Sequence, residues 1–394
     1  MHRREHAREN LNAERASLAQ SCPWLAQVER LVVHAAAEIQ LLSALTPLNA
    51  RTERDRLVEA VRAGRPARPL WTYAGREHTA LRRALDAAEH ALAGCARTPI
   101  DALYLARIRE LSVEAALCAA AGTPEVAPLA RGRFGLCSET RGAASALCAA
   151  WLGERPSRGS EHTGTNVVVS DAPDPRSLLS RMREAVGRLR LPFAIVAMPA
   201  LAPLAATGDR VILVATGRTV SLEDVERTVL HEVEGHARPR ARSMAATCAL
   251  FHAATAGGVD DQEGRALLIE ERAGLLGPRR RLQLAARHRA VEAMLAGACF
   301  ADVARALVHV HGIDATDAVV ATERAFRGGD GELPGLGRER IYIESLLRVR
   351  AHLDARPDDE SVMACGQVAL SAIEPLRPFA PCGVGPTPVS AVAS

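Results

Sequence analysis

Residues 221–236 read SLEDVERTVLHEVEGH and predict a helix that ends in a pair of histidines. Ser221 is a favourable N-cap, because its hydroxyl can accept a hydrogen bond from an unpaired N–H of the first turn. Asp224, three residues on, completes a capping-box-like pair. Apolar residues recur at helical spacing and predict one buried face: Leu222, Val225, Val229 and Val233. Pro239 is expected to end the helix soon after the second histidine.

His231, Glu232 and His236 form a His-Glu-x-x-x-His pattern near the end of this helix. Neutral imidazoles bind zinc well, and an adjacent carboxylate can take a proton from a metal-bound water. The histidines stand five residues apart, which on a regular helix turns them about 140° away from each other. One inserted residue in a π-bulge would return both to one face, so we expect a local widening between them. The alternative is a surface helix whose histidines and glutamate are solvated.

The composition is that of a globular protein and excludes several classes of function. The chain has 394 residues, of which 48% are hydrophobic and 24% charged. All 49 basic residues are arginine, which excludes lysine Schiff-base chemistry and a P-loop lysine. The net charge of +3 and the interspersed acids offer no basic face for nucleic acid. Nine cysteines without a C-x-x-C pair are expected to be buried free thiols.

No membrane or export signal is found in the sequence. No apolar run is long enough for a transmembrane helix, and the charged N-terminus lacks the apolar segment of a signal peptide. We therefore expect a cytoplasmic location and no membrane partner.

Helical patterns predominate before the motif, and a short series of strands leads into it. A polar arm in residues 1–20 precedes a first packed helix expected from Leu25 to about Leu45, and further helices follow to residue 121. Three short apolar runs are predicted to be strands: Asn166–Ser170, Phe193–Met198 and Arg210–Thr216. A sheet in this place would support the motif helix, and its edge strand could pair with an extended peptide substrate.

Helices are also expected after the motif. One is predicted at 241–256, where Gly257-Gly258 would break it, and Asp260 or Asp261 would cap the next. Further helical patterns follow at four places: 280–296, 300–311, 315–326 and 338–354. The tail from Glu374 holds five prolines in twenty-one residues and is expected to be disordered.

A third metal ligand should come from an element near the motif helix, because a catalytic zinc site usually has three protein ligands and one open position. Glu263 lies in the first turn of the next well-defined helix, and Gly264 beside it leaves space for close approach of the metal helix or a substrate. Glu270 and Glu271 follow one or two turns later. Composition does not choose among the three glutamates.

The segment HEVEGH, followed by QEGRALLIEERAGLL, resembles the pattern of the microtubule-associated tyrosine carboxypeptidase-like metallopeptidases. Their bacterial relatives are the flavohemoglobin expression-modulating QEGLA motif proteins. Further similar segments occur in the same order over roughly residues 40–355: LTPLNARTERDRLVEA, PLWTYAG, LAARHRAVEAMLAGACF and RAFRGGD…RIYIESLLRV. In this family the second residue of the Gln/Glu-Glu-Gly-Leu-Ala stretch is the third zinc ligand, and here that residue is Glu263.

The chain departs from the family pattern in three places. Arg265-Ala266 replaces the Leu-Ala after QEG, Gly258 stands near the place of a tyrosine, and the stretch Ala237–Arg242 is rich in arginine. Its three arginines are Arg238, Arg240 and Arg242. They are expected to form a solvated basic turn. The alternative is that they steer a substrate carboxylate toward the site. The departures bear on substrate identity more than on the zinc ligands.

The resemblance implies an α+β protein, mainly helical, with a zincin-like catalytic domain whose small sheet precedes the His-Glu-x-x-x-His helix. An N-terminal helical region is expected in residues 1–121 and the metallopeptidase-like domain in residues 122–356. A proline-rich tail, disordered at its end, is expected in residues 357–394.

The resemblance also implies roles for individual residues. Zn²⁺ would be held by three side chains: His231, His236 and Glu263. Glu232 would deprotonate the zinc-bound water and later pass the proton to the leaving amine. Tyr342 and Arg327 are candidates for stabilising the oxyanion. Arg327 or Arg324 could instead bind the substrate's C-terminal carboxylate, for which the arginine fork is suited.

The expected activity is zinc-dependent hydrolysis of a peptide or small modified peptide near its C-terminus. A zinc amidohydrolase acting on a non-peptide amide would use the same four residues, which leaves it as one alternative. A zinc-binding regulatory protein without catalysis is the other, although such a protein has no need of Glu232.

Overall fold

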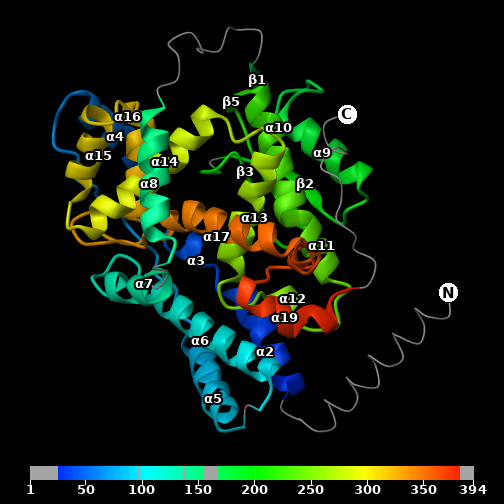
Figure 1. The fold of residues 1–394 in the computed structure, drawn as a ribbon. Coiled ribbons are helices and arrows are strands. Elements are labelled where there is room, and N and C mark those ends of the chain that lie inside the picture. The colour runs from blue at the N-terminus through cyan, green and yellow to red at the C-terminus, as the bar shows by residue number, and fades with distance from the viewer. Residues whose placement is uncertain (1–24, 96, 136–138, 155–166, 200, 382–394) are drawn as a thin grey trace.

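The computed structural model describes residues 25–95, 97–135, 139–154, 167–199 and 201–381 (Figure 1). Helices make up most of it and the strands form two small sheets, which confirms the expected mainly helical α+β class. The polar arm expected in residues 1–20 lies outside the described residues. Within the described ranges, no helix is both long and apolar enough to cross a lipid bilayer.

Seven helices are described before the first strand: α2 (Leu25–Glu38), α3 (Leu41–Ala44), α4 (Ala50–Arg62), α5 (Thr79–Cys95), α6 (Pro99–Ala119), α7 (Val126–Phe134) and α8 (Arg141–Gly153). The single helix expected from Leu25 to Leu45 is wrong, because Gln40 between α2 and α3 has the non-helical angles φ −97° and ψ 71°. Ile39 and Leu45 are both buried. On one straight helix, residues six apart point about 120° away from each other, so the break lets both enter the core.

The strands form a two-stranded and a three-stranded sheet. In the first, β1 (Val167–Val169) pairs antiparallel with β5 (Thr219–Ser221). In the second, the order is β2 (Ala194–Met198), β4 (Val211–Ala215) and β3 (Ala205–Thr207). The three predicted strands are confirmed with shorter bounds, and α9 (Leu178–Arg188) lies between the first two. β3 and β5 escaped prediction because three residues are too few to show alternation.

The motif helix is built as expected up to its second histidine. Ser221 caps α10 (Leu222–Leu230) by accepting a hydrogen bond from the Asp224 N–H at 3.0 Å. A π-helical segment, His231–Ala237, follows and confirms the predicted widening. The expectation that Pro239 ends the helix is wrong, because α11 (Arg238–Ser243) continues directly. Proline is tolerated there because it stands in the first turn of α11, where an N–H is not required.

The chain after α11 differs from the predicted continuous helix at 241–256. Only α12 (Leu250–Ala253) forms there, and Ala254 after it has a positive φ of 68°. Gly257, with φ 73°, is the N-cap of α13 (Gly258–Arg272), so neither Asp260 nor Asp261 caps this helix. Both carboxylates lie in its first turn and bind arginines from elsewhere in the chain.

The remaining helices agree closely with the predicted patterns: α14 (Pro278–Leu295), α15 (Phe300–His309), α16 (Ala315–Ala325) and α17 (Ile341–Ala355), the last preceded by the 3₁₀ turn η2 (Arg338–Arg340). The disorder expected from Glu374 is wrong as far as Phe379. The short helix α19 (Ile373–Leu376) and the 3₁₀ turn η5 (Arg377–Phe379) fold there, and Leu376 is buried; α18 (Glu360–Met363) precedes them. Residues 382–394 lie outside the described part of the chain.

Helices α13 and α17 cross at the centre of the molecule (Figure 1). On one side stand α4, α8, α14, α15 and α16, and on the other stand the strands with α9 and α10. The largest apolar cluster joins residues of α2, α6, α13 and α17 with residues beyond 360. The N-terminal helices thus share a core with the rest of the chain, and the predicted division into three parts stays a prediction.

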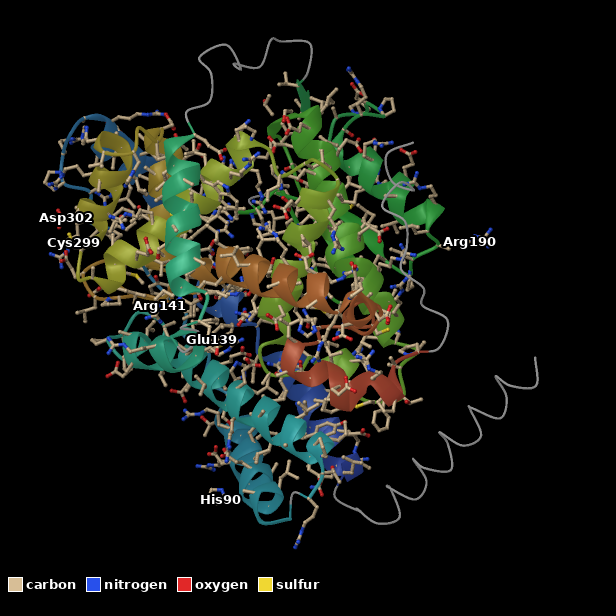
Figure 2. All side chains as sticks on the ribbon, in the orientation of Figure 1. His90, Glu139, Arg141, Arg190, Cys299 and Asp302 are labelled. Carbon is tan, nitrogen blue, oxygen red and sulfur yellow. The ribbon has the colours of Figure 1, made fainter. Side chains whose placement is uncertain are left out.

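The cysteines with described side chains are free thiols, and four of them are buried as expected: Cys118, Cys148, Cys248 and Cys365. Cys299 is half-buried and lies beside Asp302 at the outer edge of the molecule (Figure 2).

The close approach of α13 and α17 depends on Gly264. A Cβ built there would lie 2.5 Å from the backbone carbon of Ser345. We therefore expect Gly264→Ala to lower the free energy of unfolding by about 1–3 kcal/mol, measured by urea denaturation. Gly187→Ala in α9 is the matched control, because nothing lies within 4 Å of its Cβ. That change should stabilise by about 0.5–1 kcal/mol, and equal effects of the two would contradict this packing.

Candidate metal centre

Three potential ligand atoms converge where η1 meets α13. The Nε2 atoms of His231 and His236 are 3.2 Å apart. Oε2 of Glu263 is 3.6 Å from the first and 3.7 Å from the second. Ligands bound tetrahedrally to zinc at 2.0–2.2 Å lie about 3.4 Å from one another. The spacing therefore fits a single zinc ion, and no other such group of three is found among the residues that the structure describes.

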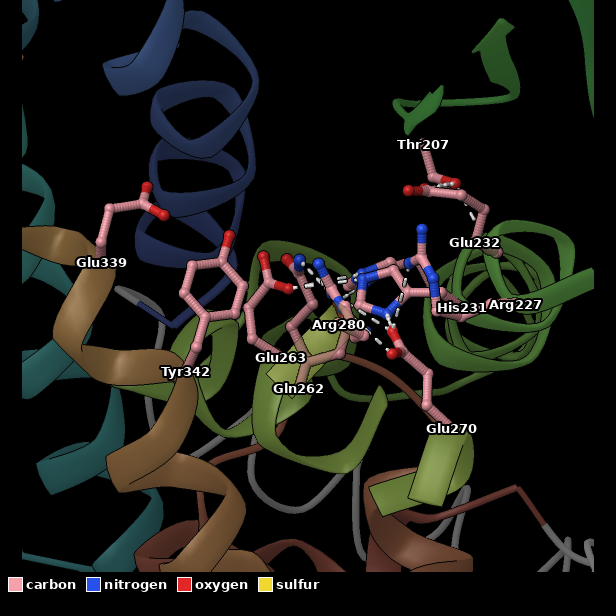
Figure 3. A network of polar contacts seen from close by, with 12 residues as sticks. Thr207, Arg227, His231, Glu232, Gln262, Glu263, Glu270, Arg280, Glu339 and Tyr342 are labelled. Carbon is pink, nitrogen blue, oxygen red and sulfur yellow. Dashed lines mark hydrogen bonds and ion pairs between the residues drawn. The ribbon is translucent and has the colours of Figure 1, made fainter. Parts of the chain in front are cut away.

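Glu232 lies beside these ligands and is turned toward the edge strand β3. Its side chain is buried, and Oε2 accepts a hydrogen bond from the Thr207 hydroxyl at 2.7 Å (Figure 3). Thr207 thus fixes one carboxylate oxygen of Glu232. The sequence held no signal for Thr207, because β3 was not predicted.

The other ring nitrogen of each histidine is hydrogen-bonded. Nδ1 of His231 lies 2.6 Å from Oε1 of Glu270, and Nδ1 of His236 lies 2.8 Å from Oε1 of Gln262. Since a carboxylate and an amide oxygen can only accept, each Nδ1 donates to its partner, and Nε2 is the ring nitrogen that faces the cluster. Both rings are therefore oriented so that Nε2 is the nitrogen turned toward a metal.

Glu270 is fully buried and is held by Arg280 at 3.2 and 3.3 Å. Burial opposes ionisation, but the charge of Arg280 and the hydrogen bond with His231 lower the pKa of Glu270 to about 2. Of the three glutamates that sequence left open, Glu263 faces the histidines and Glu270 supports one of them. Glu271 points away and pairs with Arg350 at 2.6 Å.

Glu270→Gln is expected to weaken zinc binding by about 10–100-fold, because losing a charged partner makes the ligating imidazole a poorer donor. Competition against a chromophoric chelator measures the affinity. Glu271→Gln, one residue along the same helix, is the matched control and should bind zinc as the unaltered protein does. Equal affinities in the two variants would show that Glu270 does not support the site.

Gly235 and Gly264 bring the helices around the centre together. A Cβ on Gly235 would lie 2.7 Å from the Cβ of Ala266, so η1 packs directly against α13. The space beside Gly264, expected for the metal helix or a substrate, is instead filled by Ser345 of α17. That contact brings the start of α17, with Tyr342, close to Glu263.

Arg338 connects Glu263 with Tyr342 and was not foreseen. Its Nη2 donates to Oε1 of Glu263 at 3.2 Å, and its Nη1 donates to the Tyr342 hydroxyl at 3.3 Å. Burial, and then the negative charge of Glu263, raise the pKa of Tyr342, so its hydroxyl keeps its proton. Arg338 lies in the turn PGLGRER, which ends in three successive charged residues. Nothing in this pattern indicates which of the three would reach the site.

Arg324 and Arg327 surround Glu339, which lies beside Tyr342 on the side opposite the histidines (Figure 3). Nε of Arg324 is 3.1 Å from Oε2 of Glu339. Arg327 is half-buried and acts electrostatically on the same carboxylate. Direct contact of either arginine, or of Tyr342, with a substrate stays a prediction.

A cavity of about 500 Å³ adjoins the centre. At one end it is lined by side chains of the centre: Thr207, His236, Gln262 and Arg338. Its walls come from α2, α3, α6 and α7, and they include Arg107, Glu114 and Arg133. These helices lie about a hundred residues or more before the motif, so local sequence patterns could not associate them with it.

The arginines after the motif are less solvated than expected. Arg238 pairs with Glu234 at 2.9 Å, and its side chain is only 20% exposed. Arg240 pairs with Asp209 at 3.2 Å and lines the cavity. The expected solvated basic turn is therefore wrong, since all three arginines form part of α11: Arg238 and Arg240 make ion pairs, and Arg242 donates to the Ala364 carbonyl at 3.4 Å.

One helix presents two histidines, with a glutamate directly after the first of them. A glutamate from a second helix faces them, and an edge strand lies beside them. This arrangement is typical of peptidases. The family model of the microtubule-associated tyrosine carboxypeptidases matches residues 61–389. The chain belongs to this family, which confirms the resemblance seen in its motifs. Membership implies a carboxypeptidase-type activity. A search of curated proteins finds no match.

Proposed function

We propose that the protein is a zinc-dependent carboxypeptidase that removes residues from the C-terminus of a peptide or small modified peptide. The observation that carries this proposal is the convergence of three ligand atoms within 3.2–3.7 Å, with Glu232 adjacent. His231, His236 and Glu263 are the proposed zinc ligands. When bound, zinc supplies a Lewis acid that polarises the scissile carbonyl and makes water more acidic.

Glu232 is the proposed general base and acid. Its carboxylate would take a proton from the attacking water and return it to the leaving amine, a contribution worth about 10²–10⁴ in rate. The hydrogen bond from Thr207 to one oxygen leaves the other oxygen available for this proton. That contact supports catalysis over a purely regulatory role, because a binding protein needs no oriented carboxylate beside its metal.

Tyr342 is the proposed donor to the oxyanion that forms during attack. Arg338 donates to the Tyr342 oxygen, so the phenolic proton stays available for a second partner. One such donor is worth about 10²–10³ in kcat.

The substrate is proposed to run along β3 and to place its upstream residues against the cavity. Among the described strands, β3 pairs with β4 alone, so its other edge has backbone groups available for an extended peptide. Arg324 and Arg327 are proposed to bind the terminal carboxylate. A zinc amidohydrolase would need neither an edge strand nor arginines for a terminal carboxylate, which makes the peptidase the better-supported alternative.

The proposal is tested with a peptide library and zinc-loaded protein, analysed by mass spectrometry. Each peptide is supplied with a free C-terminus and as its C-terminal amide. We expect stepwise loss from the free C-termini and at least tenfold slower cleavage of the amides. Internal cleavage, equal cleavage of both forms, or no cleavage of any peptide would contradict a carboxypeptidase.

A further inference from the structure

Four arginines surround the carboxylate of Glu339, which is 1% exposed: Arg287 of α14, Arg324 of α16, Arg327 of the turn after α16, and Arg338 of η2. Oε2 of Glu339 lies 3.1 Å from Nε of Arg324 and 3.8 Å from Nη1 of Arg287. Burial opposes ionisation, but these four charges lower the pKa of Glu339 to about 2. Glu339 is therefore ionised and is the central acid of the cluster.

The cluster holds more positive than negative charge. Arg338 is engaged by Glu263, which leaves three guanidiniums around one carboxylate. Of the nearby acids, Glu323 accepts hydrogen bonds from Nε and Nη2 of Arg54, at 2.7 and 2.8 Å. Asp317 is exposed, and the charge of Arg279 affects its pKa more strongly than the charge of Arg287 does. Among the described residues, two positive charges are thus left without an acid of their own.

This excess is costly to the protein without a bound anion. Burial, followed by repulsion from Arg324, lowers the pKa of Arg287 to about 9, and the same two causes lower the pKa of Arg327. Placing buried like charges together is unfavourable unless a counter-charge compensates them. Such arrangements are typical of sites that bind a charged ligand.

Solvent still reaches the cluster. The side chains of Arg287 and Arg324 retain 16% and 19% exposure. Nε of Arg324 makes no hydrogen bond despite its short distance from Glu339. Part of each of these two side chains is therefore within reach of an anion from solvent, and the buried Nε of Arg324 lacks a hydrogen bond from the protein.

The cluster adjoins the metal centre through Tyr342. Tyr342, with its hydroxyl, lies between Glu339 of the cluster and Glu263 of the centre (Figure 3). Arg338 then connects the same hydroxyl to Glu263. An anion held by the three arginines would lie one side chain away from the proposed zinc ligands, as the end of a bound peptide must.

We propose that this arginine cluster selects peptides whose last residue is glutamate or aspartate. Such a residue carries two carboxylates, one for each positive charge left over at the cluster. A C-terminal tyrosine, the residue in the family's name, brings only one carboxylate and leaves one buried positive charge uncompensated. The proposal rests on the proposed carboxypeptidase function and specifies its substrate class.

Two peptides that differ only in ending in glutamate or glutamine provide the kinetic test, because they match in shape and differ by one charge. We expect kcat/KM for the glutamate peptide to be at least tenfold higher than for the glutamine peptide. It should also be higher than for a peptide that ends in tyrosine. Arg287→Gln should reduce the glutamate preference below threefold. Arg289→Gln, on the same helix but 49% exposed, should keep it. Equal rates, or preference for glutamine or tyrosine, would overturn the proposal.

Binding separates this inference from the catalytic proposal. N-acetyl-L-glutamate and N-acetyl-L-glutamine are titrated into the full chain by calorimetry, before and after zinc loading. At least tenfold tighter binding of the glutamate compound, lost in Arg287→Gln and Arg327→Gln variants that melt cooperatively, would support the anion site even if no peptide is cleaved. Equal affinity for the two compounds would reject it even if peptides are cleaved.

Discussion

Peptide cleavage by Glu232→Gln is expected to be about 10²–10⁴-fold slower in kcat than cleavage by the unaltered protein. Glutamine has the same shape and can still accept the hydrogen bond from Thr207 that Glu232 accepts at 2.7 Å. It cannot take a proton from water. Zinc content should stay at one per chain, because Glu232 is not among the three converging ligands. Rates come from mass spectrometry and zinc content from plasma emission.

Glu234→Gln is the matched control for this variant. Glu234 lies on the same π-helical segment, but its side chain pairs with Arg238 instead of facing the ligands. It should retain full activity. The assignment of the base would be wrong if Glu232→Gln cleaved peptides at an undiminished rate and Glu234→Gln cleaved them more slowly.

Glu263→Ala is expected to abolish stable zinc binding. Losing a ligand should weaken zinc binding more than losing a supporting residue does, and the latter weakens it by about 10–100-fold. Zinc at 1,000 times its dissociation constant stabilises a folded protein by about 4 kcal/mol, so the unaltered protein should melt at a higher temperature with zinc. The variant should show no such increase.

Glu271→Ala serves as the control for Glu263→Ala, because it lies on the same helix and points toward Arg350. Its melting temperature should rise with zinc as that of the unaltered protein does. Stabilisation of Glu263→Ala by zinc to the same extent would show that the metal is held elsewhere.

Local sequence patterns predicted the parts of the centre that lie on single helices. The five-residue spacing of His231 and His236 called for a π-helical segment, and that segment is present. The N-cap at Ser221 followed from its hydroxyl, which can accept a hydrogen bond from an unpaired N–H of the first turn. Glu263, Glu270 and Glu271 could not be ranked by spacing, because their orientation depends on how α13 packs against η1 and α17.

The parts that escaped prediction depend on contacts between distant segments. Thr207 belongs to a strand of three residues, too short to show alternation. Arg338 acts on Glu263 across seventy-five residues of sequence. Pro239 was read as a stop signal, yet it stands in the first turn of α11, where its missing N–H does no harm. For Thr207 and Arg338, tertiary packing decided the outcome; for Pro239, its position within the turn decided it.

Anomalous diffraction at the zinc absorption edge, on crystals of the zinc-loaded full chain, tests the central claim most directly. The account predicts one strong peak about 2.0–2.2 Å from each of three atoms: Nε2 of His231, Nε2 of His236 and Oε2 of Glu263. The peak should vanish in Glu263→Ala. No peak at this position, or one only at other side chains, would contradict the account.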